Sequence, residues 1–279
     1  MNLCIHLSIV SLLLAFYTSC SITSNITEVN QNRTPSFTSI PQLDFILEEN
    51  YLIVYTLQRG SADGKNFSTA LDFQNYAWAL NKAKYRELKK YDNSELDNLH
   101  TKKFRDNFDT YFEELKNSIQ YKKLYKETVE YKNDCAKEWN KNLNKSFELM
   151  KKITKLHFQF PKSVKIYITH PAVSNGSALD RKNFKIAWGD WGHFPNYSTV
   201  YLWHEILHSF MDIDDVSHAV IQMATDNELR ARLNNTTFPP FVGHESLKPL
   251  MDKIYSKWKT YLNSEMNLID FAKTINDSL

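Results

Sequence analysis

A long stretch of helical periodicity between Leu43 and Phe160 is the feature that most constrains the fold of this chain. Apolar residues recur in it at intervals of three and four, as they do on the buried face of an amphipathic helix. One such series is Phe108, Tyr111, Phe112, Leu115, Ile119 and Leu124. The lysine-rich stretches between such series are typical of solvated helix faces. We therefore expect residues 43–160 to form a mainly helical region whose first helix begins at Leu43.

The pattern changes at Pro161. The segment VKIYIT alternates as a strand does, and FKIAWGDW predicts a second strand after the loop VSNGSALDRKN. Helices are expected through VYLWHEILHSFM, with Ser198 or Thr199 as N-cap, through HAVIQMATDNELRARLN, and in the tail from Ser246. With only 6 glycines in 279 residues, these patterns are typical of an α+β, helix-rich protein rather than a barrel or sandwich.

The first 19 residues have the properties of a signal peptide. They contain an apolar run from Leu7 to Tyr17 and no charged side chain. This run has the length of the apolar core of a secretory signal and is too short to span a bilayer. We therefore expect residues 1–19 to direct export and the mature protein to be extracytoplasmic.

Cys20 and the residues around it indicate a lipid anchor. Small residues at positions 18 and 19 precede Cys20, as in the cleavage box of bacterial lipoproteins, where the cysteine becomes the lipidated N-terminus. Tyr17 stands where such boxes usually carry Leu, so ordinary signal-peptide cleavage and secretion are the alternative. Residues 20–42 are rich in Ser, Thr, Asn and Gln, which predicts a flexible tether. Membrane contact is then expected only through a lipid at Cys20, in a cell-envelope lipoprotein.

Charge and cysteine content exclude several classes of partner and fold. The 34 Lys and Arg against 32 Asp and Glu give a net charge of +2, too small for nucleic acid to be the main partner. Of the three cysteines only Cys135 lies in the predicted folded body, so no disulfide framework is expected. We interpret Cys135 as a structural residue rather than a nucleophile.

The segment from His204 to His208, HEILH, is the zinc motif HExxH. Positions i and i+4 on a helix lie on one face about 5–6 Å apart, so two imidazoles can bind one tetrahedral zinc ion. Glu205 lies about 100° round the helix from His204, where it can take a proton from zinc-bound water. The motif therefore predicts Zn²⁺ as cofactor, His204 and His208 as two of its ligands, and Glu205 as general base.

A catalytic zinc site needs a third protein ligand. Four residues downstream of the motif could supply it: Asp212, Asp214, His218 and Glu228. Glu228 follows Asn227 and lies 20 residues after His208. In this spacing the sequence resembles the gluzincins, specifically the thermolysin-like peptidases, over about residues 198–234. The resemblance implies that Glu228 is the third ligand and that residues 161–279 form a zincin-like catalytic region, with a small sheet over the HExxH helix.

The sequence departs from the thermolysin-like pattern four residues after Glu228. Those enzymes carry there an Asp that supports the first zinc ligand, whereas this chain has Arg232. Support for His204 must then come from another carboxylate, and Asp212 and Asp226 are the candidates.

Other residues near the motif offer further assignments. The metzincin pattern would make Asp214 the third ligand, although Met211 stands at the position where that pattern has Gly. For stabilising the transition state the candidates are Tyr197, Tyr201 and His244. We select His244 because an imidazole above the open zinc position could stabilise the developing oxyanion.

Together these features predict an exported zinc metallopeptidase that hydrolyses peptide bonds of a peptide or protein substrate. The strand at residues 184–188 could bind an extended peptide by edge pairing. Endopeptidase activity is favoured because the chain has no Gly-x-Met-Glu-Asn segment of the kind that binds a free amino terminus. The alternative is a non-catalytic surface lipoprotein that binds a partner and has a structural or vestigial zinc site. The intact Glu205 favours the enzyme, since a structural site needs no base.

Overall fold

The structure is a computed structural model, and it describes residues 39–59, 68–91, 99, 101–237 and 242–278. The predicted signal peptide (1–19), Cys20 and most of the predicted tether (20–42) lie outside the described residues. The described end of the tether already belongs to the fold, because the carbonyl of Gln42 accepts a hydrogen bond of 2.8 Å from the amide of Val164. No helix in these described ranges is long and apolar enough to cross a membrane.

Helices dominate residues 43–160, as the periodicity predicts. The elements are β1 (Leu43–Ile46), α1 (Glu49–Gln58), α2 (Ser68–Leu80), α3 (Lys82–Leu88), α4 (Lys102–Asn117) and α5 (Ile119–Thr154). The prediction is wrong at its start, where residues 43–46 form a strand instead of a helix. Their backbone pairs in parallel with β2 (Val164–Ile168), a partner far along the chain that no local pattern reveals. Helix α1 begins only after them, where the Glu48 carboxylate accepts a hydrogen bond from the Tyr51 amide.

The sheet is mixed and has four strands in the order β1-β2-β4-β3. Strands β1, β2 and β4 (Lys185–Gly189) are parallel, and β3 (Asn175–Asp180) runs antiparallel to β4 at the edge. Both strands predicted after Pro161 are confirmed, but residues 175–180 form β3 and not part of a loop. Asp180 closes the β3–β4 hairpin by accepting hydrogen bonds from the amide and the side chain of Asn183. Because β3 covers β4, residues 184–188 are not the sheet edge, and that expectation is wrong.

The predicted helices after the sheet are confirmed. The remaining elements are η2 (Pro171–Val173), α6 (Tyr197–Leu207), α7 (Asp215–Gln222), η3 (Met223–Leu229), α8 (Arg230–Leu233), η4 (Glu245–Leu247), α9 (Lys248–Leu262) and α10 (Leu268–Asn276). Helix α7, η3 and α8 follow one another without a break. The middle segment, η3, is a π-helix, a wider helical turn that occurs frequently at functional sites.

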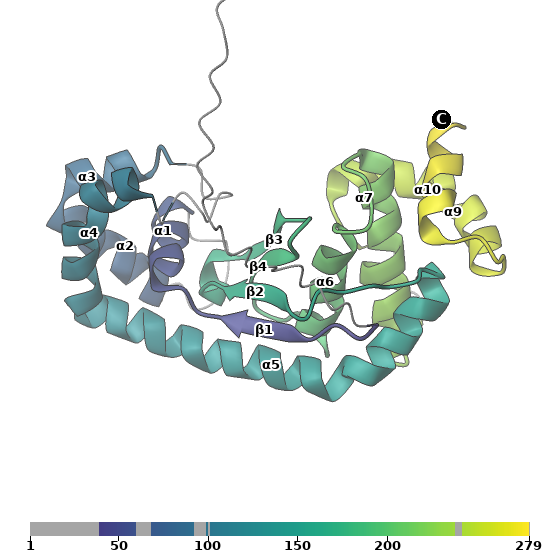
Figure 1. The fold of residues 1–279 in the computed structure, drawn as a ribbon, viewed down its shortest axis with the longest axis horizontal. Helices are drawn as coiled ribbons and strands as arrows, with labels where there is room; N and C mark the ends of the chain where they lie inside the picture. The colour runs from purple at the N-terminus through teal and green to yellow at the C-terminus, as the bar shows by residue number, and fades with distance from the viewer. Residues whose placement is uncertain (1–38, 60–67, 92–98, 100, 238–241, 279) are drawn as a thin grey trace, which may run out of the picture. The chain divides into compact units, whose positions relative to one another are not determined.

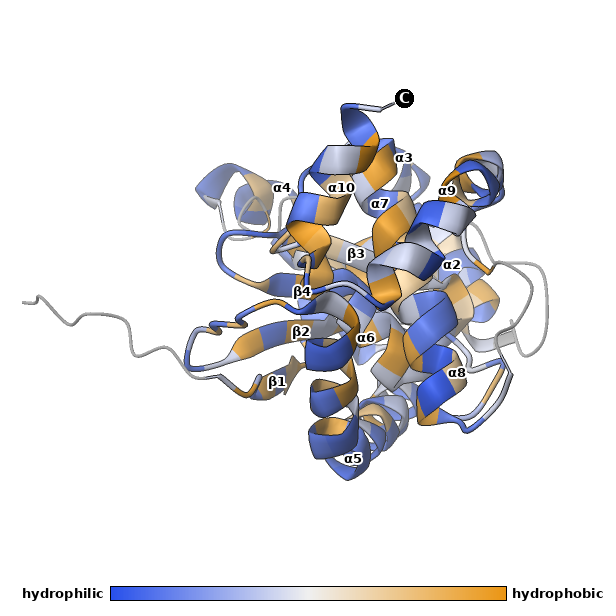
Figure 2. Ribbon diagram, turned by 90° about the vertical axis from the view of Figure 1, so that its right-hand side faces the viewer, coloured by the Kyte–Doolittle hydropathy of each residue, from blue (hydrophilic) through white to orange (hydrophobic). Residues whose placement is uncertain are grey.

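Helix α5 connects two hydrophobic cores. Near its start, Tyr121 and Leu124 belong to a core formed with α1 to α4. From Cys135 onward, its buried residues belong to a core formed with the sheet and the helices after it. Figure 1 shows α5 running below the sheet, from the first group of helices to the second. Hydrophobic and hydrophilic residues alternate along α5, α9 and α10 in Figure 2, as expected of helices with one buried face.

The sheet should be a principal source of stability. Ile166 on the central strand β2 is fully buried, whereas Ile213, between α6 and α7, is 87% exposed. We predict that Ile166→Ala lowers the free energy of unfolding by about 2–5 kcal/mol, because it leaves a cavity in the core. The matched substitution Ile213→Ala should change it by no more than about 0.5 kcal/mol. Denaturant unfolding of both variants checks the prediction, and equal losses would contradict this placement of the core.

Candidate metal centre

Helix α6 carries the HExxH motif and is held in place by α5. It begins at Tyr197, so the predicted N-cap at Ser198 or Thr199 is wrong. Its N-cap residue, Asn196, makes no side-chain capping bond. Instead the carboxylate of Glu138 on α5 accepts hydrogen bonds from the amide (2.7 Å) and the hydroxyl (2.9 Å) of Thr199. A carboxylate near the N-terminus of a helix also interacts favourably with the helix dipole. Glu138, which is distant in the sequence, thus replaces the local cap of α6.

Three histidines converge at the C-terminal end of α6. One ring nitrogen from each of His204, His208 and His218 lies within 4.8 Å of the others. The ring centroids are 5.1 Å apart for His204 and His208, 5.3 Å for His204 and His218, and 4.9 Å for His208 and His218. His204 and His208 come from the last turn and the C-cap of α6, and His218 comes from α7. Three imidazoles so grouped are a suitable donor set for one zinc ion.

The structure does not bring Glu228, the expected third ligand, to the two histidines of the motif. Its carboxylate accepts a hydrogen bond of 2.9 Å from Nε of Arg232, and Nη2 of the same guanidinium lies 2.9 Å from the same oxygen. Glu and Arg at positions i and i+4 face each other on one side of a helix, which explains the pair. Among the described residues, the only group of three or more potential ligands is formed by the three histidines.

The other two ligand candidates also have different roles. Asp214, the runner-up, is the N-cap of α7, and its carboxylate accepts hydrogen bonds of 2.8 Å from the amide and the hydroxyl of Ser217. Asp212 is exposed. Of the four downstream candidates, His218 is therefore the one that the fold places beside His204 and His208.

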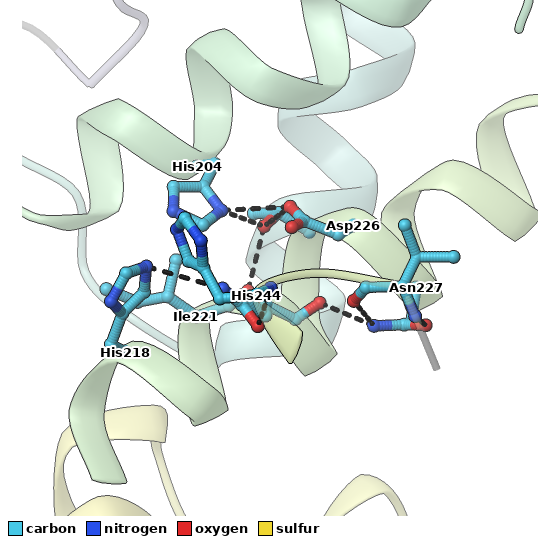
Figure 3. A network of polar contacts seen from close by, with 9 residues as sticks. His204, His218, Ile221, Asp226, Asn227 and His244 are labelled. Carbon is cyan, nitrogen blue, oxygen red and sulfur yellow. Dashed lines mark hydrogen bonds and ion pairs between the residues drawn. The ribbon is translucent and has the colours of Figure 1, made fainter. Parts of the chain in front are cut away.

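Asp226 supports the first histidine. Its Oδ1 lies 2.9 Å from Nδ1 of His204, and both side chains are buried (Figure 3). The hydroxyl of Thr225 donates to the same oxygen at 2.9 Å. Of the two supporting carboxylates proposed from the sequence, Asp226 thus contacts His204. The contact leaves Nε2 of His204 for a metal, in the carboxylate–histidine–metal arrangement that orients the ring and raises its basicity.

The protonation of the histidines suits metal binding. Burial, together with the charge on His204, lowers the pKa of His208 to about 3 and that of His218 to about 4. These two rings are therefore neutral at pH 7, as a metal ligand must be. Burial also acts to lower the pKa of His204, but the Asp226 carboxylate outweighs it and the net pKa is raised.

The side chain of Glu205 extends from α6 toward the edge strand β3. An amide of β3, that of Ala178, donates a hydrogen bond to its carboxylate. A Cβ atom at Gly176 would lie 2.9 Å from its Oε1, so only glycine fits there without displacing the carboxylate. Burial raises the pKa of Glu205 to about 7, against the lowering effect of His204. A carboxylate with a pKa in this range can accept and return a proton near neutral pH.

His244 lies beside His204 and His218, as Figure 3 shows. Its ring centroid is 4.9 Å from that of His218. The loop before it is held by η3, because the Asn227 side chain donates to the carbonyl of Val242 and accepts from its amide. The side-chain oxygen Oε1 of Gln222 accepts a further hydrogen bond of 3.2 Å from the backbone amide of His244. The structure thus brings His244 to the site, through contacts that the sequence pattern did not reveal.

A cavity of about 300 Å³ opens beside these residues. Glu205, His204 and His244 form part of its lining, and aromatic side chains from β4 and α6 form another part. Those aromatic residues are Trp188, Tyr197 and Tyr201, of which the two tyrosines were candidates for the site from the sequence. The cavity is large enough for a side chain or a small ligand next to Glu205.

Comparison with known proteins finds no match among models of protein families, curated proteins or solved structures. The thermolysin-like spacing of residues 198–234 stays a resemblance. The chemistry of the site is therefore inferred from its own residues. These are three imidazoles, the Asp226 carboxylate that contacts one of them, and the buried carboxylate of Glu205.

We predict that His218→Ala lowers zinc affinity by more than about 100-fold, because it removes one of three ligands and not merely a supporting group. The matched change Glu228→Gln should alter the affinity by less than about threefold, since Gln keeps the shape and Arg232 stays solvated. Competitive titration with a chromophoric chelator measures both. The reverse result, with zinc lost only in Glu228→Gln, would establish the gluzincin ligand set instead.

The contact between Asp226 and His204 can be tested in the same titration. Asp226→Asn should weaken zinc binding by about 10–100-fold, because His204 loses the carboxylate that orients and polarises its ring. Asp212→Asn removes the same charge from an exposed position nearby and serves as the control, with no expected change. An equal loss in both variants would show that only net charge matters.

Proposed function

We propose that this chain is a zinc-dependent hydrolase that cleaves peptide bonds, with His204, His208 and His218 as metal ligands and Glu205 as general base. The observation that carries the proposal is the convergence of three imidazole nitrogens within 4.8 Å, next to a buried carboxylate on the wall of a cavity. Structural zinc sites usually have four Cys or His ligands, whereas catalytic ones have three and an open position. A set of three histidine donors fits the second kind and so supports the proposal.

The residues of the site have complementary roles in this mechanism. A bound zinc ion supplies Lewis acidity, which activates water and polarises the scissile carbonyl. Glu205 accepts a proton from the attacking water and can return it to the leaving amine, for which a pKa of about 7 is suitable. His244 donates a hydrogen bond to the carbonyl oxygen as negative charge develops there. Asp226 holds the ring of His204 throughout.

A peptide is the substrate best matched to the surroundings of Glu205. Strand β3 is the last strand of the sheet, and it is also the strand that contacts Glu205 through Ala178 and Gly176. An extended peptide can add to a free strand edge by backbone hydrogen bonds. Such pairing at β3, rather than at residues 184–188, would bring a scissile bond to the general base. The absence of a segment of the Gly-x-Met-Glu-Asn type favours endopeptidase activity.

Export is the second part of the proposal and rests on residues 1–42 alone. Their pattern favours a cell-envelope lipoprotein with a lipid on Cys20, or a secreted protein. The competing function is a non-catalytic surface lipoprotein, whose helices α1 to α5 bind a partner and whose zinc is structural. Glu205 distinguishes the two functions, because a zinc hydrolase needs a general base and a structural zinc site does not.

We predict that Glu205→Gln keeps about one zinc per chain but lowers kcat by about 10²–10⁴-fold, since Gln preserves the shape but cannot accept a proton. Elemental analysis measures the zinc, and mass spectrometry of a broad peptide library measures cleavage. A fully active Glu205→Gln variant would rule out this mechanism. A parent protein that binds zinc tightly and cleaves nothing would favour the structural-zinc alternative.

A further inference from the structure

Asp190 is a carboxylate that the proposed chemistry leaves without a role. It directly follows β4 and lines the same cavity as Glu205. Its Oδ2 accepts hydrogen bonds of 3.1 Å from the hydroxyls of Tyr197 and Ser174. Its backbone is held as well, because Tyr131 donates its hydroxyl to the Asp190 carbonyl and accepts from the Asp190 amide. The carboxylate therefore has a fixed position at the cavity wall.

Asp190 forms no ion pair with the Lys and Arg side chains of the described residues, and none of these side chains lines the cavity. Nearby, Arg230 lies over the ring of Phe194, with its Cζ 3.9 Å from the centroid. Both hydrogen bonds that the described residues donate to the carboxylate reach Oδ2 and come from neutral hydroxyls, so these residues leave Oδ1 as a free acceptor. A half-buried carboxylate without a counter-ion in a cavity is suited to bind a cation.

The aromatic walls of the cavity favour the same kind of ligand. The rings of Trp188 and Tyr201 are stacked, with centroids 6.0 Å apart and planes at 15°. The ring centroid of Tyr197 lies 4.6 Å from that of Tyr201, and the Tyr197 hydroxyl donates a hydrogen bond to Asp190. The faces of Trp and Tyr attract ammonium and guanidinium groups. Asp190 and these three rings thus combine the two interactions by which proteins bind organic cations.

We propose that this cavity is the specificity pocket of the enzyme and binds a cationic group of the substrate next to the scissile bond, with Asp190 as its counter-ion. The cation is a Lys or Arg side chain or a free α-amino group. The inference rests on the proposed peptidase function, because Glu205 and Asp190 line one cavity. Its volume of about 300 Å³ is at the small end for ligand pockets and fits a single side chain.

Matched peptides test the proposal on the full-length protein. We expect N-acetylated peptides with Arg beside the scissile bond to be cleaved with a kcat/KM about 10–100-fold above the same peptides with citrulline, the neutral isostere. In Asp190→Asn this ratio should fall to near one, because Asn keeps the shape but not the charge. Asp212→Asn, which removes an exposed carboxylate outside the cavity, should keep the ratio of the parent. Zinc content equal to that of the parent shows that each variant is folded.

Peptides with a free amino terminus identify the source of the cation. If the α-amino group is the ligand, only unacetylated peptides should be cleaved rapidly, one residue from the end, and Asp190→Asn should remove that preference. If a side chain is the ligand, acetylation should have no effect. Cleavage that is indifferent to both Arg and a free amino terminus would overturn the inference while leaving the peptidase function intact.

Calorimetric binding separates failure of the inference from failure of the proposed function. Zinc-loaded Glu205→Gln protein should bind the acetylated Arg peptide, or in the α-amino case the free-amine peptide, about 10–100-fold more tightly than its neutral counterpart. Adding Asp190→Asn should remove the difference. If the parent cleaves no peptide but this charge-dependent binding is present, the pocket is upheld and the peptidase function fails. Equal affinity for charged and neutral peptides would overturn the pocket.

Discussion

Helix α5 is the constraint on which both the fold and the candidate site depend. Its second half packs Trp139 against Trp203 of α6, with ring centroids 5.6 Å apart. Two polar contacts act at the same interface, since Glu138 binds the first turn of α6 and Ser146 accepts a hydrogen bond of 3.0 Å from the Trp203 indole. Trp203 directly precedes His204, so a rotation of α6 that displaced the histidines would also break these buried contacts. The site is thus positioned by a helix that contributes no residue to it.

The elements that the sequence predicts correctly are those whose signals are local. The spacing of His204 and His208 and the apolar neighbours of the motif are sufficient for α6, and periodicity is sufficient for most of α1 to α5. Strands β1 and β3 escape prediction because each depends on a partner strand. The sequence of β3, NGSALD, has no β-branched or aromatic residue, and only its pairing with β4 makes it a strand. The start of α6 is missed for a similar reason, since Glu138 from α5 replaces a local cap.

The histidine that joins His204 and His208 cannot be predicted from spacing, because its position depends on how the helical segment formed by α7, η3 and α8 is rotated. Asp226 and Glu228 are two residues apart and so point about 160° away from each other on an α-helix. Once Asp226 faces His204, Glu228 faces elsewhere and pairs with Arg232, an i,i+4 pattern that the sequence does contain. In an uninterrupted α-helix His218 would lie about 80° from Asp226. Because the turns of η3 are wider, His218 and Asp226 lie closer to the same face of this helical segment, and both side chains reach His204.

Charge balance is the remaining constraint on the cavity. Asp190, Glu205 and Asp226 line it, and the described chain adds no Lys or Arg to this lining. His208 and His218 are held neutral by their lowered pKa values, and the Asp226 carboxylate contacts the buried ring of His204. A divalent metal would compensate the charge near Asp226 and Glu205, and a substrate cation would compensate Asp190. The carboxylates that line the cavity are therefore the same groups that would make it selective for cations.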